Sequence, residues 1–123
     1  MSRIKVAVIG AGYLGEFHAQ KYKANKNVDL IAIVDTNITR CKEIARKNNA
    51  QIYNNYKDIT DLVDAVSIVV PTNLHYKIAN HFIKNNKHVL IEKPFASNLN
   101  EAKKLEKLST EKNIILQVGH LER

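Results

Sequence analysis

The stretch VAVIGAGYLGEFHA, from Val6 to Ala19, decides the fold class of this chain. It begins inside an apolar, β-branched run that is too short for a helix, which predicts a buried strand from Ile4 to Ile9. Three glycines follow in the order Gly-x-Gly-x-x-Gly, and after them apolar side chains recur at helical spacing. A strand, a glycine-rich turn and a helix in this order predict the start of a βαβ unit that binds a dinucleotide.

The three glycines have different expected tasks in such a turn. Gly10 permits the tight turn, Gly12 lets the backbone approach a pyrophosphate, and Gly15 lets the helix pack closely on the strand. The free amides at the start of the helix then face the phosphates. The whole loop is therefore a candidate cofactor-binding segment, comprising Gly10, Ala11, Gly12, Tyr13, Leu14 and Gly15.

An acidic residue stands where this kind of site needs one. A second strand is predicted from Val28 to Val34, and Asp35 follows it, about 20 residues after the third glycine. Its carboxylate can accept hydrogen bonds from the adenosine ribose hydroxyls, and Asp35 or Thr36 can also cap the next helix. A carboxylate there would repel the 2'-phosphate of NADP, so NAD is favoured. Arg40 and Lys42 on the following helix could reach a phosphate and leave NADP open.

The remainder of the chain continues the alternation of strands and helices. Strands alternating with helices of this length predict a parallel sheet covered on both faces, because right-handed crossovers place the helices there. We expect one doubly wound α/β domain of the Rossmann type over residues 1–123, with six strands. The expected later elements are a helix around Ile38 to Ala45, a short strand Gln51 to Tyr53, a brief helix within residues 56–64, a strand Ala65 to Val70 stopped by Pro71, a helix from Leu74 to Ile83, a strand His88 to Ile91, a helix from Leu99 to Leu108 with Asn98 as a possible cap, and a strand Ile114 to Val118.

The charge balance raises a nucleic-acid alternative. There are 19 Lys and Arg residues against 12 Asp and Glu, a formal net charge of +7. The cations are scattered through segments with helical or turn spacing, without the interleaved aromatic residues that single-strand binders use. We therefore predict solvated helix faces and no nucleic-acid partner.

Other function classes are excluded by simpler observations. No apolar run approaches the roughly 18 to 20 residues that cross a bilayer, so we expect no membrane span and a cytoplasmic location. Cys41 is the only cysteine, which rules out an internal disulfide and a cysteine-rich metal site. Its position on the apolar face of a predicted helix makes it a core residue, and no metal ligands are predicted.

Three further stretches follow predicted strands at the edge where open α/β sheets bind ligands. They are VVPTNLH, IEKP and VGHLER. Together with GAGYLG they make the chain resemble the amino-terminal half of the glucose-fructose oxidoreductase and inositol dehydrogenase family, often written Gfo/Idh/MocA. The resemblance covers essentially the whole chain, and the ordered set of motifs carries it.

The resemblance implies roles for individual residues. Glu92 would help to hold the nicotinamide ribose, while His120 and Arg123 match positions near the substrate mouth, or form a frayed terminus. The loop after the fourth strand would line the cofactor near its nicotinamide end, through Pro71, Thr72, Asn73 and His75. For His75 a solvent-facing place in the first helical turn is the alternative.

Lys93 is the candidate catalytic residue, and it also belongs to the expected cofactor-binding set. The resemblance implies that it reaches the reacting hydroxyl of a sugar or polyol, whose proton must leave during hydride transfer. A lysine with the ordinary pKa of about 10.4 is a poor base at neutral pH. Burial and the positive charge of an oxidised nicotinamide would both lower that pKa. Pro94 restricts the backbone of the turn.

Members of this family usually continue into a second domain that carries the substrate pocket. We therefore expect this chain to be the NAD(P)-binding half of an oxidoreductase acting on a sugar, sugar nucleotide or polyol, without the carboxy-terminal substrate domain. It should bind the dinucleotide with little or no turnover. The alternative is a non-catalytic dinucleotide-binding module or a subunit of a split enzyme, and an oligomer is compatible with either.

Overall fold

The computed structural model describes residues 3–92 and 99–119, and these form one six-stranded parallel sheet. The strand order is β3-β2-β1-β4-β5-β6, which is the order of the Rossmann fold. The strands are β1 (Ile4–Ile9), β2 (Val28–Val34), β3 (Gln51–Tyr53), β4 (Ala65–Ile68), β5 (His88–Glu92) and β6 (Leu116–Gly119). The sequence-based prediction of a doubly wound α/β fold is confirmed.

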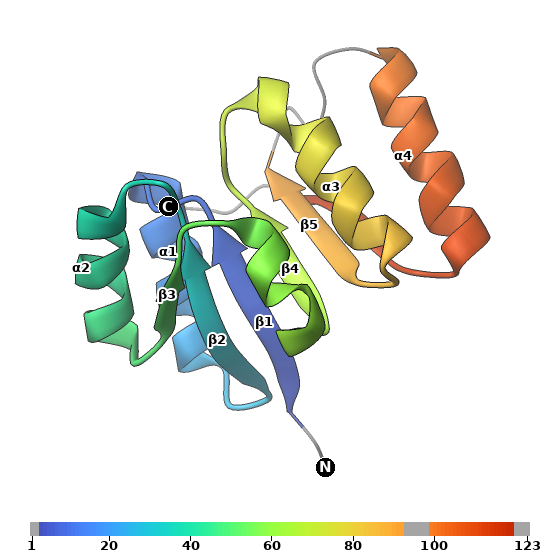
Figure 1. Cartoon of the computed structure of the whole chain (residues 1–123). Helices are drawn as coiled ribbons and strands as arrows, with labels where there is room; N and C mark the ends of the chain where they lie inside the picture. The colour runs from blue at the N-terminus through green and yellow to red at the C-terminus, as the bar shows by residue number, and fades with distance from the viewer. Residues whose placement is uncertain (1–2, 93–98, 120–123) are drawn as a thin grey trace.

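Helices cover both faces of the sheet (Figure 1). On one face α1 (Tyr13–Ala24) and α2 (Ile38–Asn48) pack against β1, β2 and β3. On the other face lie α3 (His75–Lys84) and α4 (Leu99–Lys112), together with the 3₁₀ helix η1 (Tyr56–Leu62). A second short 3₁₀ helix, η2 (Thr72–Leu74), leads into α3. None of the helices in the described part of the chain is long and apolar enough to cross a membrane.

The strands are apolar on both sides, so the protein has a core layer on each face. Phe82 of α3 and Leu105 of α4 are fully buried in one layer. Cys41 and Ile44 of α2 are fully buried in the other, which confirms Cys41 as a core residue. Burial raises the pKa of the Cys41 thiol to about 11, so at neutral pH it stays protonated and unreactive.

The predicted ends of three strands were wrong, and hydrogen bonds outside the sheet accompany the two larger differences. Strand β4 ends at Ile68 rather than Val70, and the Val70 carbonyl accepts a hydrogen bond from the ring of His75 outside the sheet. Strand β5 ends at Glu92, one residue later than predicted. Strand β6 runs from Leu116 to Gly119 rather than from Ile114 to Val118. The Ile114 amide donates to the Ser109 carbonyl at 3.1 Å and so closes the end of α4.

The predicted cap of α2 was also wrong. Asn37, rather than Asp35 or Thr36, is the N-cap, and its side chain accepts from the Arg40 amide. Asp35 lies two residues too early and its carboxylate is occupied elsewhere. The brief helix expected after Asn55 is the 3₁₀ helix η1, and Asn98 lies outside the described residues.

Candidate functional site

Two adjoining cavities lie at the carboxyl ends of the strands. The first has a volume of about 520 Å³ and is bounded by Asp35, and the second has a volume of about 440 Å³ and is bounded by Glu92. Both volumes fall in the range of small-molecule sites. The cavities share part of their lining, so they form one elongated cleft. The shared residues are Gly12, Val69, Val70 and Pro71.

The cleft lies where the strand order reverses between β1 and β4, the point at which open α/β sheets bind ligands. The glycine-rich loop follows β1 there. Gly10 has φ +116°, and a Cβ on it would overlap the Val69 carbonyl oxygen. A Cβ on Gly15 would overlap the Gly10 carbonyl oxygen, whereas one on Gly12 would meet no atom within 4 Å. The surrounding backbone thus leaves no room for a side chain at Gly10 or Gly15, while Gly12 has open space beside the cleft.

The first turn of α1 contributes directly to the second cavity, through Gly12, Tyr13 and Leu14. Gly12 is the N-cap, and no side chain caps the helix there. The backbone amides of a first turn have no partner within the helix, and together with the helix dipole they attract anions. An uncapped helix start beside an open glycine is a suitable place for a phosphate group.

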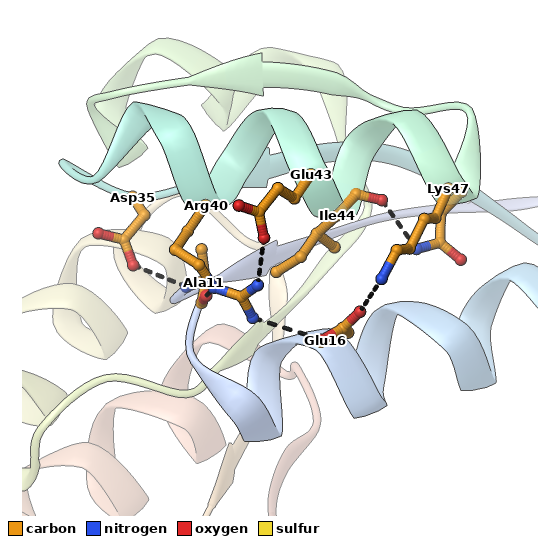
Figure 2. A network of polar contacts seen from close by, with 8 residues as sticks. Ala11, Glu16, Asp35, Arg40, Glu43, Ile44 and Lys47 are labelled. Carbon is orange, nitrogen blue, oxygen red and sulfur yellow. Dashed lines mark hydrogen bonds and ion pairs between the residues drawn. The ribbon is translucent and has the colours of Figure 1, made fainter.

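Asp35 is held at one end of the cleft by backbone donors. Its Oδ2 accepts from the Ala11 amide, a contact drawn in Figure 2, at a distance of 2.6 Å. Its Oδ1 accepts from the Asn37 amide at 2.9 Å. The carboxylate is partly buried and borders the first cavity. Its position therefore follows from the glycine-rich loop and from the start of α2.

Arg40 connects the loop to both helices beside it (Figure 2). Its Nε donates to the Ala11 carbonyl at 3.1 Å, and its guanidinium pairs with Glu43 at 2.7 Å and with Glu16 at 3.3 Å. Lys47 also binds Glu16, at 3.0 Å, and this contact is the main reason that the pKa of Glu16 lies below its usual range. Arg40 does not border either cavity of the cleft, and its charge is matched by two carboxylates.

Lys42, the other cation considered for phosphate binding, borders a separate hollow between α2 and β3, together with Arg46 and Ile52. That hollow contains none of the predicted cofactor-binding residues. Arg40 and Lys42 therefore differ, since Arg40 adjoins the glycine-rich loop and Lys42 does not.

Glu92 ends β5 and borders the second cavity. Its Oε2 lies 3.1 Å from Nε2 of His18, whose side chain is 1% exposed against 13% for Glu92. Burial lowers the pKa of His18, and the hydrogen bond that its ring donates to Glu92 opposes that shift without cancelling it. The imidazole is thus neutral at pH 7.

His75, the first residue of α3, is 2% exposed and borders the second cavity. The solvent-facing alternative for this residue was wrong, because its Nε2 lies 2.7 Å from the Val70 carbonyl and donates to it. With that proton on Nε2, Nδ1 is left as an acceptor, and it has no partner among the described residues.

The other predicted residues fall into three groups. Pro71 and Thr72 border the cleft, whereas Asn73 is exposed and borders neither cavity. Ala11 and Gly15 are buried in the loop beneath the cleft. The remaining positions lie outside the described residues, namely Lys93, Pro94, His120 and Arg123.

The structure also shows cleft residues that sequence reasoning missed. The apolar part of the lining includes Val69, Val70 and Ile78, and Tyr56 of η1 closes one side. A signal for the valines existed, because Val69 and Val70 end the predicted strand Ala65 to Val70 at the ligand edge of the sheet. For His18 the only signal was a histidine on the packed face of α1.

Comparison with known proteins agrees with this architecture. The model of the Gfo/Idh/MocA oxidoreductase family, NAD-binding Rossmann fold, matches residues 4–120. The chain belongs to this family.

Among its relatives, UDP-N-acetylglucosamine 3-dehydrogenase of Acidithiobacillus ferrooxidans is 37% identical over 123 residues. A solved structure of that enzyme superposes with a TM-score of 0.91 and covers 98% of this chain. GenD2 from gentamicin A biosynthesis, solved in complex with NAD, gives a TM-score of 0.93 at 29% identity over 97% of the chain. Inositol 2-dehydrogenase of Rubrobacter xylanophilus is 31% identical over 98% of the chain.

The match covers only part of these relatives. The chain corresponds to 39% of the Acidithiobacillus enzyme, 35% of GenD2 and 36% of the inositol dehydrogenase. The similarity therefore concerns the NAD-binding Rossmann part of the family.

Proposed function

We propose that this chain is the NAD-binding part of a dehydrogenase that transfers hydride between a nicotinamide cofactor and a hydroxyl of a sugar or sugar nucleotide. The observation that carries the proposal is the elongated cleft, with Asp35 at one end, Glu92 at the other and the uncapped start of α1 between them. This is the order of groups that a dinucleotide needs, with hydroxyl acceptors at both ends and anion-binding amides in the middle.

The cofactor is proposed to lie along the cleft in one direction. Asp35 would accept from the adenosine ribose, and the first turn of α1 would bind the pyrophosphate above the open side of Gly12. Glu92 would accept from the nicotinamide ribose, and His75 would stand beside the nicotinamide end. When bound, the nicotinamide ring supplies the hydride chemistry that protein side chains lack.

NAD is proposed in preference to NADP. The Asp35 carboxylate would lie close to a 2'-phosphate and repel it. Arg40, the cation that adjoins the loop, already pairs with Glu16 and Glu43 and has no uncompensated charge to offer. GenD2 was solved with NAD, which agrees with this preference.

Lys93 is proposed to orient the substrate hydroxyl and to take its proton, because it directly follows Glu92 in the chain. A sugar nucleotide is the first substrate to test, because one relative is a UDP-N-acetylglucosamine 3-dehydrogenase. Little or no turnover by this chain alone, a cytoplasmic location and any oligomeric state stay predictions.

Titration with NADH and NADPH, followed by nicotinamide fluorescence, tests the proposal. The chain has no tryptophan, so the signal is free of that background. We expect saturable binding of NADH and at least about tenfold weaker binding of NADPH, as the loss of a charged contact would give. Absence of binding to both cofactors would contradict the proposal, and tighter binding of NADPH would contradict the role given to Asp35.

Turnover is tested separately with NAD and UDP-N-acetylglucosamine, by the absorbance of NADH at increasing protein concentration. Hydride transfer requires the reacting carbon to be held at near-attack distance. We expect no NADH formation above the background without protein. A rate comparable to that of ordinary dehydrogenases would show that this chain suffices for catalysis.

A further inference from the structure

The contact between His18 and Glu92 joins two elements that are distant in the sequence. His18 lies in the second turn of α1, and Glu92 ends β5, 74 residues later. The two side chains are 1% and 13% exposed, so water has little access to their contact. A hydrogen bond to a charged group in such surroundings is stronger than one on the surface.

The position of the ring proton follows from the partners. A carboxylate has only acceptor atoms, and the imidazole is neutral, so the proton of His18 must be on Nε2 to make the 3.1 Å contact. Nδ1 is then a bare acceptor, and it is buried without a partner among the described residues. The ring is therefore held in one tautomer by Glu92.

Neighbouring contacts fix the orientation of this ring. Tyr22, one turn further along α1, packs edge-on against His18 with the ring centroids 6.5 Å apart. The Tyr22 hydroxyl makes a hydrogen bond to the Ser67 hydroxyl of β4. Helix α1 is thus tied to β4 and to β5 by two polar contacts in succession, and His18 has little freedom to turn away from Glu92.

The remaining oxygen of Glu92 has no partner among the described residues and faces a cavity that a ligand can enter. Within residues 3–92 and 99–119, Oε1 makes no hydrogen bond, and Glu92 borders the second cavity. A glutamate has three side-chain torsions, and a bond to one oxygen removes most of that freedom before a ligand arrives.

We propose that His18 is a positioning residue. Its Nε2–H holds Oε2 of Glu92, so that Oε1 is directed to a ribose hydroxyl at the nicotinamide end of the cleft. This inference rests on the proposed function and names a residue of α1 that acts on cofactor binding only through Glu92.

The competing explanation is that His18 merely fills space under the sheet. A buried imidazole whose Nδ1 has no partner within residues 3–92 and 99–119 costs free energy that an apolar side chain of similar size would not. Space filling alone therefore gives no reason for a histidine at this place, whereas a hydrogen-bond donor to Glu92 does.

A double-mutant cycle distinguishes the two explanations. The variants are H18L, H18Q, E92A and H18L/E92A, and each is titrated with NADH and with ADP, which lacks the nicotinamide half. Glutamine carries an amide nitrogen near the place of Nε2, so H18Q keeps a donor for Glu92, whereas leucine keeps only the volume.

We expect H18L to weaken NADH binding by about tenfold and ADP binding by less than about twofold, as the loss of a charged hydrogen bond at one end of the cleft would give. H18Q should stay within about threefold of the wild type for NADH. In the E92A background, H18L should cause no further loss, because its effect passes through Glu92. An equal loss for ADP and NADH, or a loss that persists in E92A, would overturn the proposal.

A second measurement needs no variant with altered packing. Two-bond ¹⁵N–¹H spectra of the labelled wild-type protein report the tautomer of each histidine, with H18Q used only to assign the signal. Protonation on Nε2 is expected, and a ring protonated on Nδ1 would overturn the proposal. Should the wild type bind neither NADH nor ADP, the proposed function fails, while the tautomer still decides whether His18 holds Glu92.

Discussion

Asp35 and Glu92 are both carboxylates at the carboxyl end of a strand, and both border the same cleft, yet they are supported differently. Asp35 accepts hydrogen bonds from two backbone amides, those of Ala11 and Asn37. Glu92 is held by one buried side chain, His18, from a helix distant in the sequence. The two carboxylates have similar positions in the fold, but the hydrogen-bond donors differ, since Asp35 is held by the backbone and Glu92 by a side chain.

This difference indicates how each end of the cleft responds to change. Backbone amides are present whatever the side chains, so the setting of Asp35 is part of the βαβ turn itself. The setting of Glu92 depends on the identity of one residue on α1. We therefore expect the position of the Asp35 carboxylate to change mainly when the backbone of the turn is disturbed. The position of the Glu92 carboxylate should change when a single side chain, that of His18, is replaced.

The largest effect is expected from disturbing the turn that supports the Asp35 end. In G15A the new Cβ would overlap the Gly10 carbonyl oxygen, and we expect the free energy of unfolding to fall by about 3 kcal/mol or more. The matched control is G12A, whose Cβ meets no protein atom within 4 Å and should change stability by less than about 1 kcal/mol. Urea denaturation measures both, and equal stability of the two variants would contradict the geometry of the loop.

The next largest effect concerns Asp35 itself. D35A removes the acceptor for the adenosine ribose, and we expect NADH and ADP binding both to weaken by about tenfold or more. In E92A, by contrast, only NADH binding should weaken. Parallel titrations of the two variants measure the difference, and a loss of NADH binding alone in D35A would place the adenosine elsewhere.

A smaller effect is expected from pH on the free energy of unfolding. The group that holds Glu92, the imidazole of His18, can titrate, whereas the backbone amides that hold Asp35 cannot. Burial lowers the pKa of His18 below its ordinary value of about 6.5, so the unfolded chain binds a proton that the folded protein does not. Stability is therefore full above about pH 6.5 and falls as the pH drops toward 5. Urea denaturation between pH 5 and 7 should show this slope.

His81 has a lowered pKa for the same main reason, burial, and must contribute to the same slope. Comparison of H18Q and H81Q with the wild type separates the two histidines, since each variant should lose part of the pH dependence. If the slope of H18Q equals that of the wild type, His18 is not the buried neutral group described here.

The smallest effect is expected at the surface ion pairs that join α1 to α2. Lys47 is 59% exposed in its pair with Glu16, and exposed pairs of this kind contribute less than about 1 kcal/mol. K47A should lower stability by no more than about 0.5 kcal/mol and leave NADH binding unchanged. Thermal unfolding at low and high salt checks this, and a large loss would give the network in Figure 2 a greater role than exposure allows.

Much of the fold was predictable because its signals are local. A β-branched run, a glycine-rich turn and a helical period each depend on neighbours in the sequence, and they predicted all six strands. The exact ends of β4, β5 and β6 and the cap of α2 were not predicted. They depend on which acceptor each amide finds in three dimensions, and Asn37 is the cap because Asp35 is turned toward Ala11.

The sequence by itself determined the Rossmann fold, the glycine-rich loop and the place of Asp35, since these follow from short-range periodicity and spacing. Only the tertiary structure decided that His75 is buried, that Arg40 is paired with two carboxylates, and that His18 meets Glu92. The last contact joins residues 74 positions apart on a helix and a strand. Such a pair forms only when α1 packs onto the sheet, and no local pattern records it.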